Sequence, residues 1–155
     1  MGTSKLRSCL AAVAVTAGAT ALPPVVEAKP TAGIVYGGKS AAKWPVMVAV
    51  SRDGRQVSYA VAAWRTACTD GTGSDTEEFE NIPLSAGGKF AKSYDTGDYQ
   101  DGTATVRFAG SIDGKLNKRR SKITGTVRVM FSVKDPVNGV DYACDTGTVK
   151  YTAIN

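Results

Sequence analysis

The 155-residue chain contains no histidine. Hydrolases of the Ser-His-Asp and Cys-His types use histidine to take the proton of the nucleophile, so the sequence excludes both in their usual form. Histidine is also the commonest metal ligand in proteins, and its absence removes the usual zinc sites. We therefore expect no metal and no cofactor, and an enzyme built on this chain would have to work with carboxylates.

Long apolar runs are also scarce, and the only one lies near the N-terminus at residues 9–22. Two cations precede it within residues 1–7, two prolines end it at residues 23–24, and Val26-Glu27-Ala28 offers a cleavage site. This layout predicts a secretory signal peptide over residues 1–28, because a membrane-spanning helix needs about 20 apolar residues. We expect a secreted, extracellular protein without a membrane span.

Cysteine is rare as well, with three residues in the chain. Cys9 leaves with the signal peptide, so Cys68 and Cys144 remain, and two cysteines in an exported chain predict one disulfide. The bridge would close a loop of 76 residues. Loop-closure entropy then gives an upper figure of about 4–5 kcal/mol for its stabilisation.

Charge of one sign does not dominate the chain. Cleavage after Ala28 removes two cations and one anion, so the net charge falls from +5 to +4. The concentrated basic sites are Lys115, Lys118, Arg119, Arg120 and Lys122. They suit contact with a polyanion, or simply the solvated tip of a hairpin, and they lack interleaved aromatic residues for base stacking. We expect no nucleic-acid partner and consider a cell-wall polymer or extracellular glycan as the partner.

Alternation of apolar and polar residues is the clearest pattern that is present. It runs through residues 104–112 and again through 123–133, separated by a connection over residues 113–122. Such alternation predicts two half-buried antiparallel strands paired as a hairpin. Asp53-Gly54 predicts a second hairpin, between strands at residues 45–50 and 56–68.

No segment has helical periodicity of useful length. We expect a turn-rich loop at residues 69–74, a short edge strand at 77–84 and a polar loop at 95–102. With about seven or eight strands, the sequence predicts one all-β domain over residues 36–155, an antiparallel β-sandwich or jelly roll with one disulfide. A flexible lead-in over residues 29–35 would precede it.

Carboxylates gather in two of the expected loops. One set is Asp70, Asp75, Glu77, Glu78 and Glu80, and the other is Asp95, Asp98 and Asp101. A pair taken from these acids could serve a polysaccharide hydrolase, although solvated loop acids are the simpler interpretation. Residues 95–102 could also attract calcium, but their spacing does not match the EF-hand loop.

The two tryptophans, Trp44 and Trp64, are the candidate ligand-binding aromatics. Large aromatic rings with a polar edge stack on sugars, yet both residues lie within apolar strands, where packing in the core is the competing interpretation.

Short motifs occur in a particular order along most of the chain. They are Gly38-Lys39-Ser40, the strand at residues 45–50, Arg55-Gln56-Val57, Cys68-Thr69-Asp70-Gly71, Ile82-Pro83, Gly88-Lys89-Phe90, Thr124-Gly125-Thr126-Val127 and Cys144-Asp145-Thr146-Gly147-Thr148-Val149. In this order the chain resembles a family of small secreted actinobacterial β-sandwich domains of uncharacterised function, with Tyr151 in place of an expected tryptophan. The resemblance implies a β-sandwich with a Cys68–Cys144 bridge and brings no catalytic residues.

These observations favour a non-enzymatic module, exported to the cell exterior or envelope, that binds a glycan or another envelope polymer. Two alternatives remain open from the sequence. One is a secreted hydrolase that uses carboxylates of the two acidic loops, and the other is a secreted inhibitor or protein-binding domain.

Overall fold

The computed structural model describes residues 33–69 and 71–155. The expected signal peptide, Cys9 and the loop acid Asp70 lie outside these residues. Within the described part of the chain every regular element is a β-strand, and there is no helix long and apolar enough to cross a membrane. The strands are β1 (Ile34–Ser40), β2 (Pro45–Val50), β3 (Gln56–Cys68), β4 (Gly71–Pro83), β5 (Lys89–Asp95), β6 (Tyr99–Asp101), β7 (Ala104–Leu116), β8 (Lys122–Asp135), β9 (Val140–Asp145) and β10 (Val149–Ile154).

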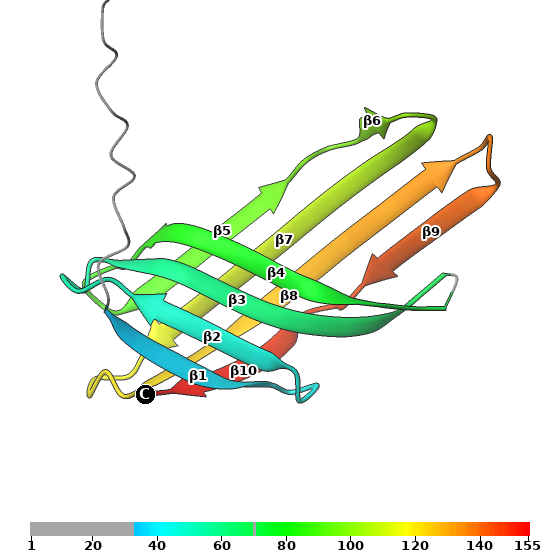
Figure 1. Ribbon diagram of the computed structural model, residues 1–155. Helices are drawn as coiled ribbons and strands as arrows, with labels where there is room; N and C mark the ends of the chain where they lie inside the picture. The colour runs from blue at the N-terminus through cyan, green and yellow to red at the C-terminus, as the bar shows by residue number, and fades with distance from the viewer. Residues whose placement is uncertain (1–32, 70) are drawn as a thin grey trace, which may run out of the picture.

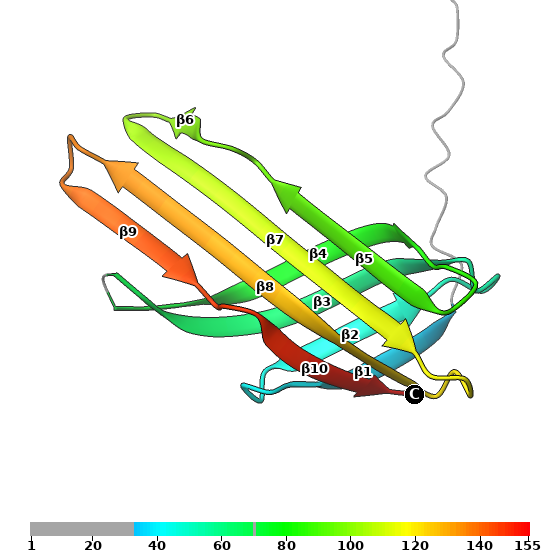
Figure 2. The ribbon, with the colours of Figure 1, turned by 180° about the vertical axis from the view of Figure 1, so that it is seen from behind.

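Antiparallel pairing joins these ten strands in one sheet. Its order is β10-β1-β2-β3-β9-β8-β7-β5, while β4 pairs with β3 and β6 pairs with β7. β10 also pairs with β8, so the sheet turns continuously around one side of the molecule. Figure 1 shows β1–β4 in front of β5, β7 and β8, with the two groups crossing at an angle, and Figure 2 shows the same arrangement from behind. The all-β antiparallel class is confirmed, but the expected count of seven or eight strands was too low.

The alternating segments form the β7–β8 hairpin that the sequence predicts. Phe108 faces Phe131 in its register, and the pairing continues to Leu116 opposite Ile123. The connection spans only residues 117–121, which is shorter than expected. The apolar–polar alternation ends at residue 112 in the sequence because Gly114, at the next inward position of β7, has no apolar side chain. The strand itself continues to Leu116.

The prediction of a loop at residues 69–74 was wrong for residues 71–74, and the edge strand expected at 77–84 is longer than predicted. β3 and β4 are both 13 residues long and pair from Gln56–Pro83 to Cys68–Gly71. The inward side of β4 begins with small residues because it passes the disulfide. A Cβ added at Gly73 would lie 2.8 Å from the Cys68 sulfur and 2.9 Å from the Cys144 sulfur, so glycine fits a tight place.

Cys68 and Cys144 form the predicted disulfide, with an S–S length of 2.05 Å and a Cα–Cα separation of 4.3 Å. Cys144 lies within β9. The two cysteines are also the point at which β3 pairs with β9. The bridge therefore fastens the β1–β4 group to the β7–β9 group.

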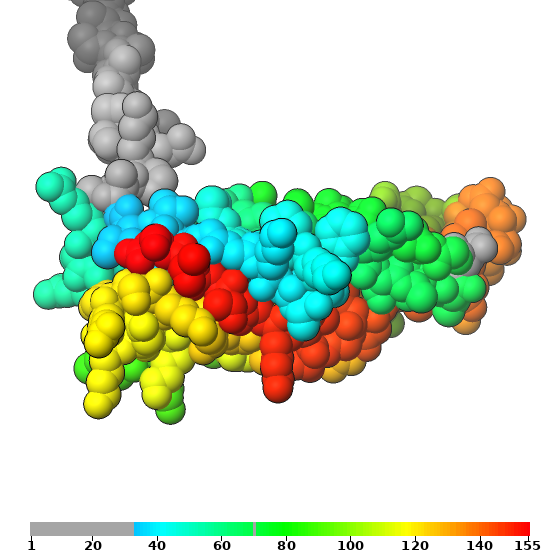
Figure 3. All heavy atoms as spheres, turned by 90° about the horizontal axis from the view of Figure 1, so that it is seen from below, coloured from blue at the N-terminus to red at the C-terminus, as the bar shows by residue number. Residues whose placement is uncertain are grey.

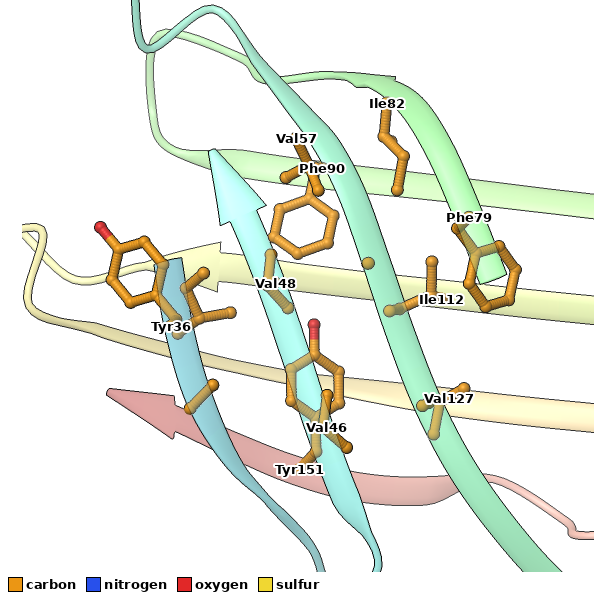
Figure 4. Packing of buried hydrophobic residues seen from close by; sticks show 14 of the residues in the cluster. Tyr36, Val46, Val48, Val57, Phe79, Ile82, Phe90, Ile112, Val127 and Tyr151 are labelled. Atoms are coloured by element: carbon orange, nitrogen blue, oxygen red, sulfur yellow. The ribbon is translucent and has the colours of Figure 1, made fainter. Parts of the chain in front are cut away.

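The core fills the space between the two groups of strands, as Figure 4 shows for Tyr36, Phe79, Ile112 and Tyr151. Two glycines of β7 make room for aromatic rings of β5. A Cβ at Gly110 would lie 2.6 Å from the ring of Tyr94, and one at Gly114 would collide with Phe90.

At the far end of the β7–β8 hairpin the inward pattern is less complete than predicted. Phe108 remains 36% exposed, and Phe131 and Val133 are only half-buried. Figures 1 and 2 give the reason, because β7, β8 and β9 extend past the strands of the other group.

Candidate anion-binding groove

Three turns meet at one end of the molecule and enclose a groove of about 910 Å³. They connect β2 to β3, β4 to β5, and β7 to β8. Backbone hydrogen bonds hold them together: the Leu84 N–H donates to the Arg55 carbonyl at 2.8 Å, and the Leu116 N–H donates to the Gly88 carbonyl at 2.8 Å. In Figure 3 the β7–β8 turn, in yellow, lies at this end beside the ends of β1 and β10.

The lining of the groove is cationic. It contains Arg55, Lys115, Lys118, Arg120 and Lys122, and no carboxylate. The salt bridges found among the described residues involve Arg107 and Arg128, so none of these five cations is paired in that way. Like charges gathered around a hollow give it a positive potential that attracts anions.

Asn117 organises the turn that carries most of these cations. Its side-chain oxygen accepts hydrogen bonds from the backbone N–H groups of Ser121, at 2.9 Å, and Lys122, at 3.3 Å. Its backbone N–H and carbonyl bond to Lys122 and Arg120 at 2.9 Å each. Arg120 has a positive φ of 52°, which this closed turn imposes on it. The cations therefore project from an ordered turn.

Arg120 also ties this turn to the rest of the molecule. The buried Tyr36 hydroxyl donates to the Arg120 carbonyl at 2.6 Å, and burial raises the pKa of that hydroxyl. The Arg120 guanidinium donates to the Gly54 carbonyl at 3.3 Å. A Cβ at Gly54, whose φ is +68°, would lie 2.8 Å from the same guanidinium, so the β2–β3 turn approaches it closely.

A second hollow of about 610 Å³ adjoins the groove. The two share Leu84, Ser85, Lys115 and Thr124, and the second adds Lys89. It also contains one acid, Asp113, whose carboxylate accepts a hydrogen bond from Thr126. The positive lining thus continues past the first hollow.

The structure brings together most of the predicted polyanion contacts. Lys115, Lys118, Arg120 and Lys122 line the groove, while Arg119 is exposed on the same turn outside the lining. Arg55 also lines the groove but was not among the predicted polyanion contacts. The sequence shows Arg55 only as a basic residue after the Asp53-Gly54 turn. No local pattern indicates that the β2–β3 turn lies beside the β7–β8 turn.

The two candidate tryptophans lie away from the groove lining. Trp44 precedes β2 and is half-buried, and its backbone N–H donates to the Ser40 hydroxyl at 3.2 Å. Trp64 is half-buried against the core, and its buried indole nitrogen has no hydrogen-bond partner among the described residues. The register of β2 with β3 brings both to the same end of that pair.

Two of the three acids of the second expected loop lie close to Arg107. Arg107 makes a bidentate contact with Asp95, at 3.0 and 2.5 Å, and approaches Asp98 at 3.9 Å. The bidentate hydrogen bonds lower the pKa of Asp95. Asp101 lies exposed in β6. Within the part of the chain that is described, no three acidic, cysteine or histidine side chains come together to hold a metal ion.

The described acids of the first set, Asp75, Glu77, Glu78 and Glu80, lie on β4 and are divided between its two faces. Glu78 and Glu80 are exposed, whereas Glu77 is half-buried and accepts a 2.5 Å hydrogen bond from the Tyr94 hydroxyl. Burial raises the pKa of the Glu77 carboxyl, although the bond from Tyr94 opposes this. This contact links β4 to β5, which do not pair with each other.

Comparisons of this chain with family models, curated proteins and solved structures found no match.

Proposed function

We propose that this protein is a non-enzymatic, exported module of β-sandwich type that binds an anionic envelope polymer or extracellular glycan in the groove. The observation that carries the proposal is the lining itself. Five cations from two turns and the adjoining strand ends surround one hollow without a carboxylate among them. Holding five like charges together opposes folding, so an anionic ligand would relieve an unfavourable field.

The extent of the positive surface favours a polymer over a small anion. Two adjoining hollows of about 910 and 610 Å³ share part of their lining, and Lys89 extends the row of cations into the second. Lysines predominate, and a lysine acts as a flexible point charge that does not demand one planar geometry. Such a surface suits a chain of repeated carboxylates or phosphodiesters.

Export is supported by two features. The N-terminal sequence has the three-part layout of a signal peptide. The Cys68–Cys144 disulfide is the second, since disulfides persist mainly in oxidising compartments. An exported, mildly basic domain meets anionic polymers of the cell envelope directly.

Binding rather than catalysis is supported by the chemistry of the lining. Its side chains are cations, apolar residues, one amide and two hydroxyls, and they provide neither a carboxylate pair nor a histidine. The hydrolase alternative would have to use acids of the two acidic segments, such as Glu77 or Asp95, and none of the described acids among them lines the groove.

A polymer panel tests the proposal. A polyuronate, a poly(sugar phosphate), peptidoglycan and a neutral glucan are each titrated against the purified protein at low and moderate salt, with and without calcium. We expect the two polyanions to bind without calcium and the neutral glucan not to bind. Equal binding of the neutral glucan, or binding that requires calcium, would contradict the proposal.

One strand supplies a matched pair of variants. Lys122 and Lys134 are exposed residues near opposite ends of β8, and only Lys122 lines the groove. Lys122→Glu and Lys134→Glu change the net charge equally. We expect Lys122→Glu to weaken polyanion binding at least about tenfold and Lys134→Glu to have a much smaller effect. An equal loss of affinity in the two variants would show that binding depends on net charge and not on the groove.

A further inference from the structure

Part of the outward face of β10, β1, β2 and β3 is apolar, where a solvated sheet face is normally polar. Val35 is 52% exposed, Met47 37% and Ile154 59%. Their strand neighbours Tyr36, Val48 and Ala153 point inward and are buried, so the three exposed residues belong to the opposite face.

The strand register shows that these residues are contiguous. One row runs from Ile154 through Gly37 and Met47 to Val61. The next row runs from Val35 through Ala49 to Tyr59. We call these seven residues the apolar face. Val35, Gly37, Met47 and Ile154 are exposed and Ala49, Tyr59 and Val61 are half-buried. Contiguous apolar residues across four strands differ from the scattered apolar residues of an ordinary surface and are typical of interaction sites.

The apolar face has no side chain at its centre. Gly37 lies in the middle of the first row, and a Cβ added there would meet nothing within 4 Å. Bare backbone allows a second flat surface to approach closely, and sheets pack face to face at about 10 Å. This shape suits another sheet better than a rounded or deeply inserted partner.

Charges at the margins of the apolar face are arranged asymmetrically. Glu78, opposite Val61, and Glu80, opposite Tyr59, lie on β4 at one side. Lys39 on β1 and Lys150 on β10 are exposed toward the other side. A two-fold axis parallel to the strands would place the acidic margin of one copy over the basic margin of the other. A two-fold axis across the strands would instead place acids over acids.

We propose that the apolar face binds the same face of a second copy of this chain, with the two-fold axis parallel to the strands. The contact is isologous, so each copy supplies both the acidic and the basic margin and the assembly closes as a dimer. Self-complementarity of both apolar surface and charge selects this partner. The inference is independent of the polymer-binding groove, which lies on other residues.

Sedimentation velocity of the purified protein over a wide concentration range tests the dimer. We expect a reversible monomer–dimer equilibrium. Met47→Lys should weaken dimerisation at least about tenfold, which corresponds to about 1.4 kcal/mol, because it places a charge in the apolar face. Met130→Lys is the matched control, since Met130 is 39% exposed on another strand. A chain that stays monomeric throughout, or an equal effect of the two variants, would overturn the proposal.

Charge reversal tests the orientation. Lys39→Glu and Glu78→Lys should each weaken the dimer, and the double variant should recover much of the lost affinity, because both margins exchange sign together. Failure of the double variant to recover would overturn the proposed axis. Adsorption to lipid vesicles that depends on Met47 without self-association would assign the face to a membrane surface and overturn the dimer. Lys118→Glu, which alters the groove, should leave dimerisation unchanged, so the two proposals fail separately.

Discussion

The hydroxyl of Tyr36 on β1 donates a 2.6 Å hydrogen bond to the carbonyl of Arg120, 84 residues further along the chain. The Tyr36 side chain is fully buried in the core. Its ring is therefore fixed by packing, and its hydroxyl fixes the turn that carries the groove cations. This single contact joins the stability of the core to the geometry of the proposed binding site.

Replacing Tyr36 by phenylalanine should affect both properties. Loss of the hydrogen bond should lower the free energy of unfolding by about 1 kcal/mol, measured by urea denaturation. The released turn should also bind an anionic polymer more weakly, because its cations lose a fixed position. Tyr151→Phe is the control, since that hydroxyl donates to the Asp113 carbonyl at 2.9 Å on β7. An equal loss of polymer affinity in both variants would contradict a specific role of the Tyr36 hydrogen bond in positioning the groove cations.

The Cys68–Cys144 bridge should stabilise the fold strongly. It closes a 76-residue interval and fastens the two groups of strands together. Reduction, or a Cys68→Ala/Cys144→Ala variant, should lower the melting temperature, with an upper limit of about 4–5 kcal/mol in stability. Thiol titration of the folded chain without residues 1–28 should find no free thiol before reduction. Two reactive thiols in the unreduced protein would contradict the bridge.

Gly110→Ala should destabilise the protein through overpacking. The added Cβ would lie 2.6 Å from the ring of Tyr94, so the ring or the strand must move. We expect a loss of about 1–3 kcal/mol in the free energy of unfolding. Gly37→Ala is the matched control on another strand, because its Cβ points into open space. Similar values for the two variants at a concentration where the protein is monomeric would contradict this packing.

Glu77→Gln should change how stability depends on pH. Burial raises the pKa of Glu77 in the folded protein above its ordinary value. The folded state therefore holds this proton more tightly, and the associated stability is present at low pH and is lost as pH rises through the folded pKa. Glutamine keeps an oxygen for Tyr94 but does not ionise, so the variant should lack this decline and be at least as stable at neutral pH.

Urea denaturation of both proteins at several pH values checks this prediction. The difference between the two curves isolates Glu77 from Asp95, Asp135 and Asp145, whose lowered pKa values give the opposite trend. A variant that becomes progressively less stable than the wild type as pH rises would contradict it.

Some of this architecture is readable from sequence because it follows local patterns. Period-two alternation predicts the β7–β8 pair, and Asp53-Gly54 predicts the β2–β3 hairpin. The first half of β4 escapes prediction because residues 71–76 are glycine, threonine, serine and aspartate, without an apolar period. This half is held by pairing with β3, whereas the predicted second half also carries the buried residues Phe79 and Ile82.

The groove is only partly predictable for a different reason. The basic run around Lys118 is visible in the sequence, since those cations are adjacent in the chain. Arg55 joins them only because the β2–β3 and β7–β8 turns meet in space, through contacts such as that between Arg120 and Gly54. Similarly, the apolar face depends on the register of four strands, which no single segment reveals.

The salt dependence of polyanion binding tests the central proposal most directly. The affinity of the wild type and of a Lys118→Ala/Lys122→Ala variant for the tightest-binding polyanion is measured across a series of salt concentrations. Counterion release predicts that log affinity falls linearly with log salt, and that loss of two contacting cations makes this slope shallower by roughly one to two. An affinity that does not respond to salt, or an identical slope in the variant, would contradict binding in the groove.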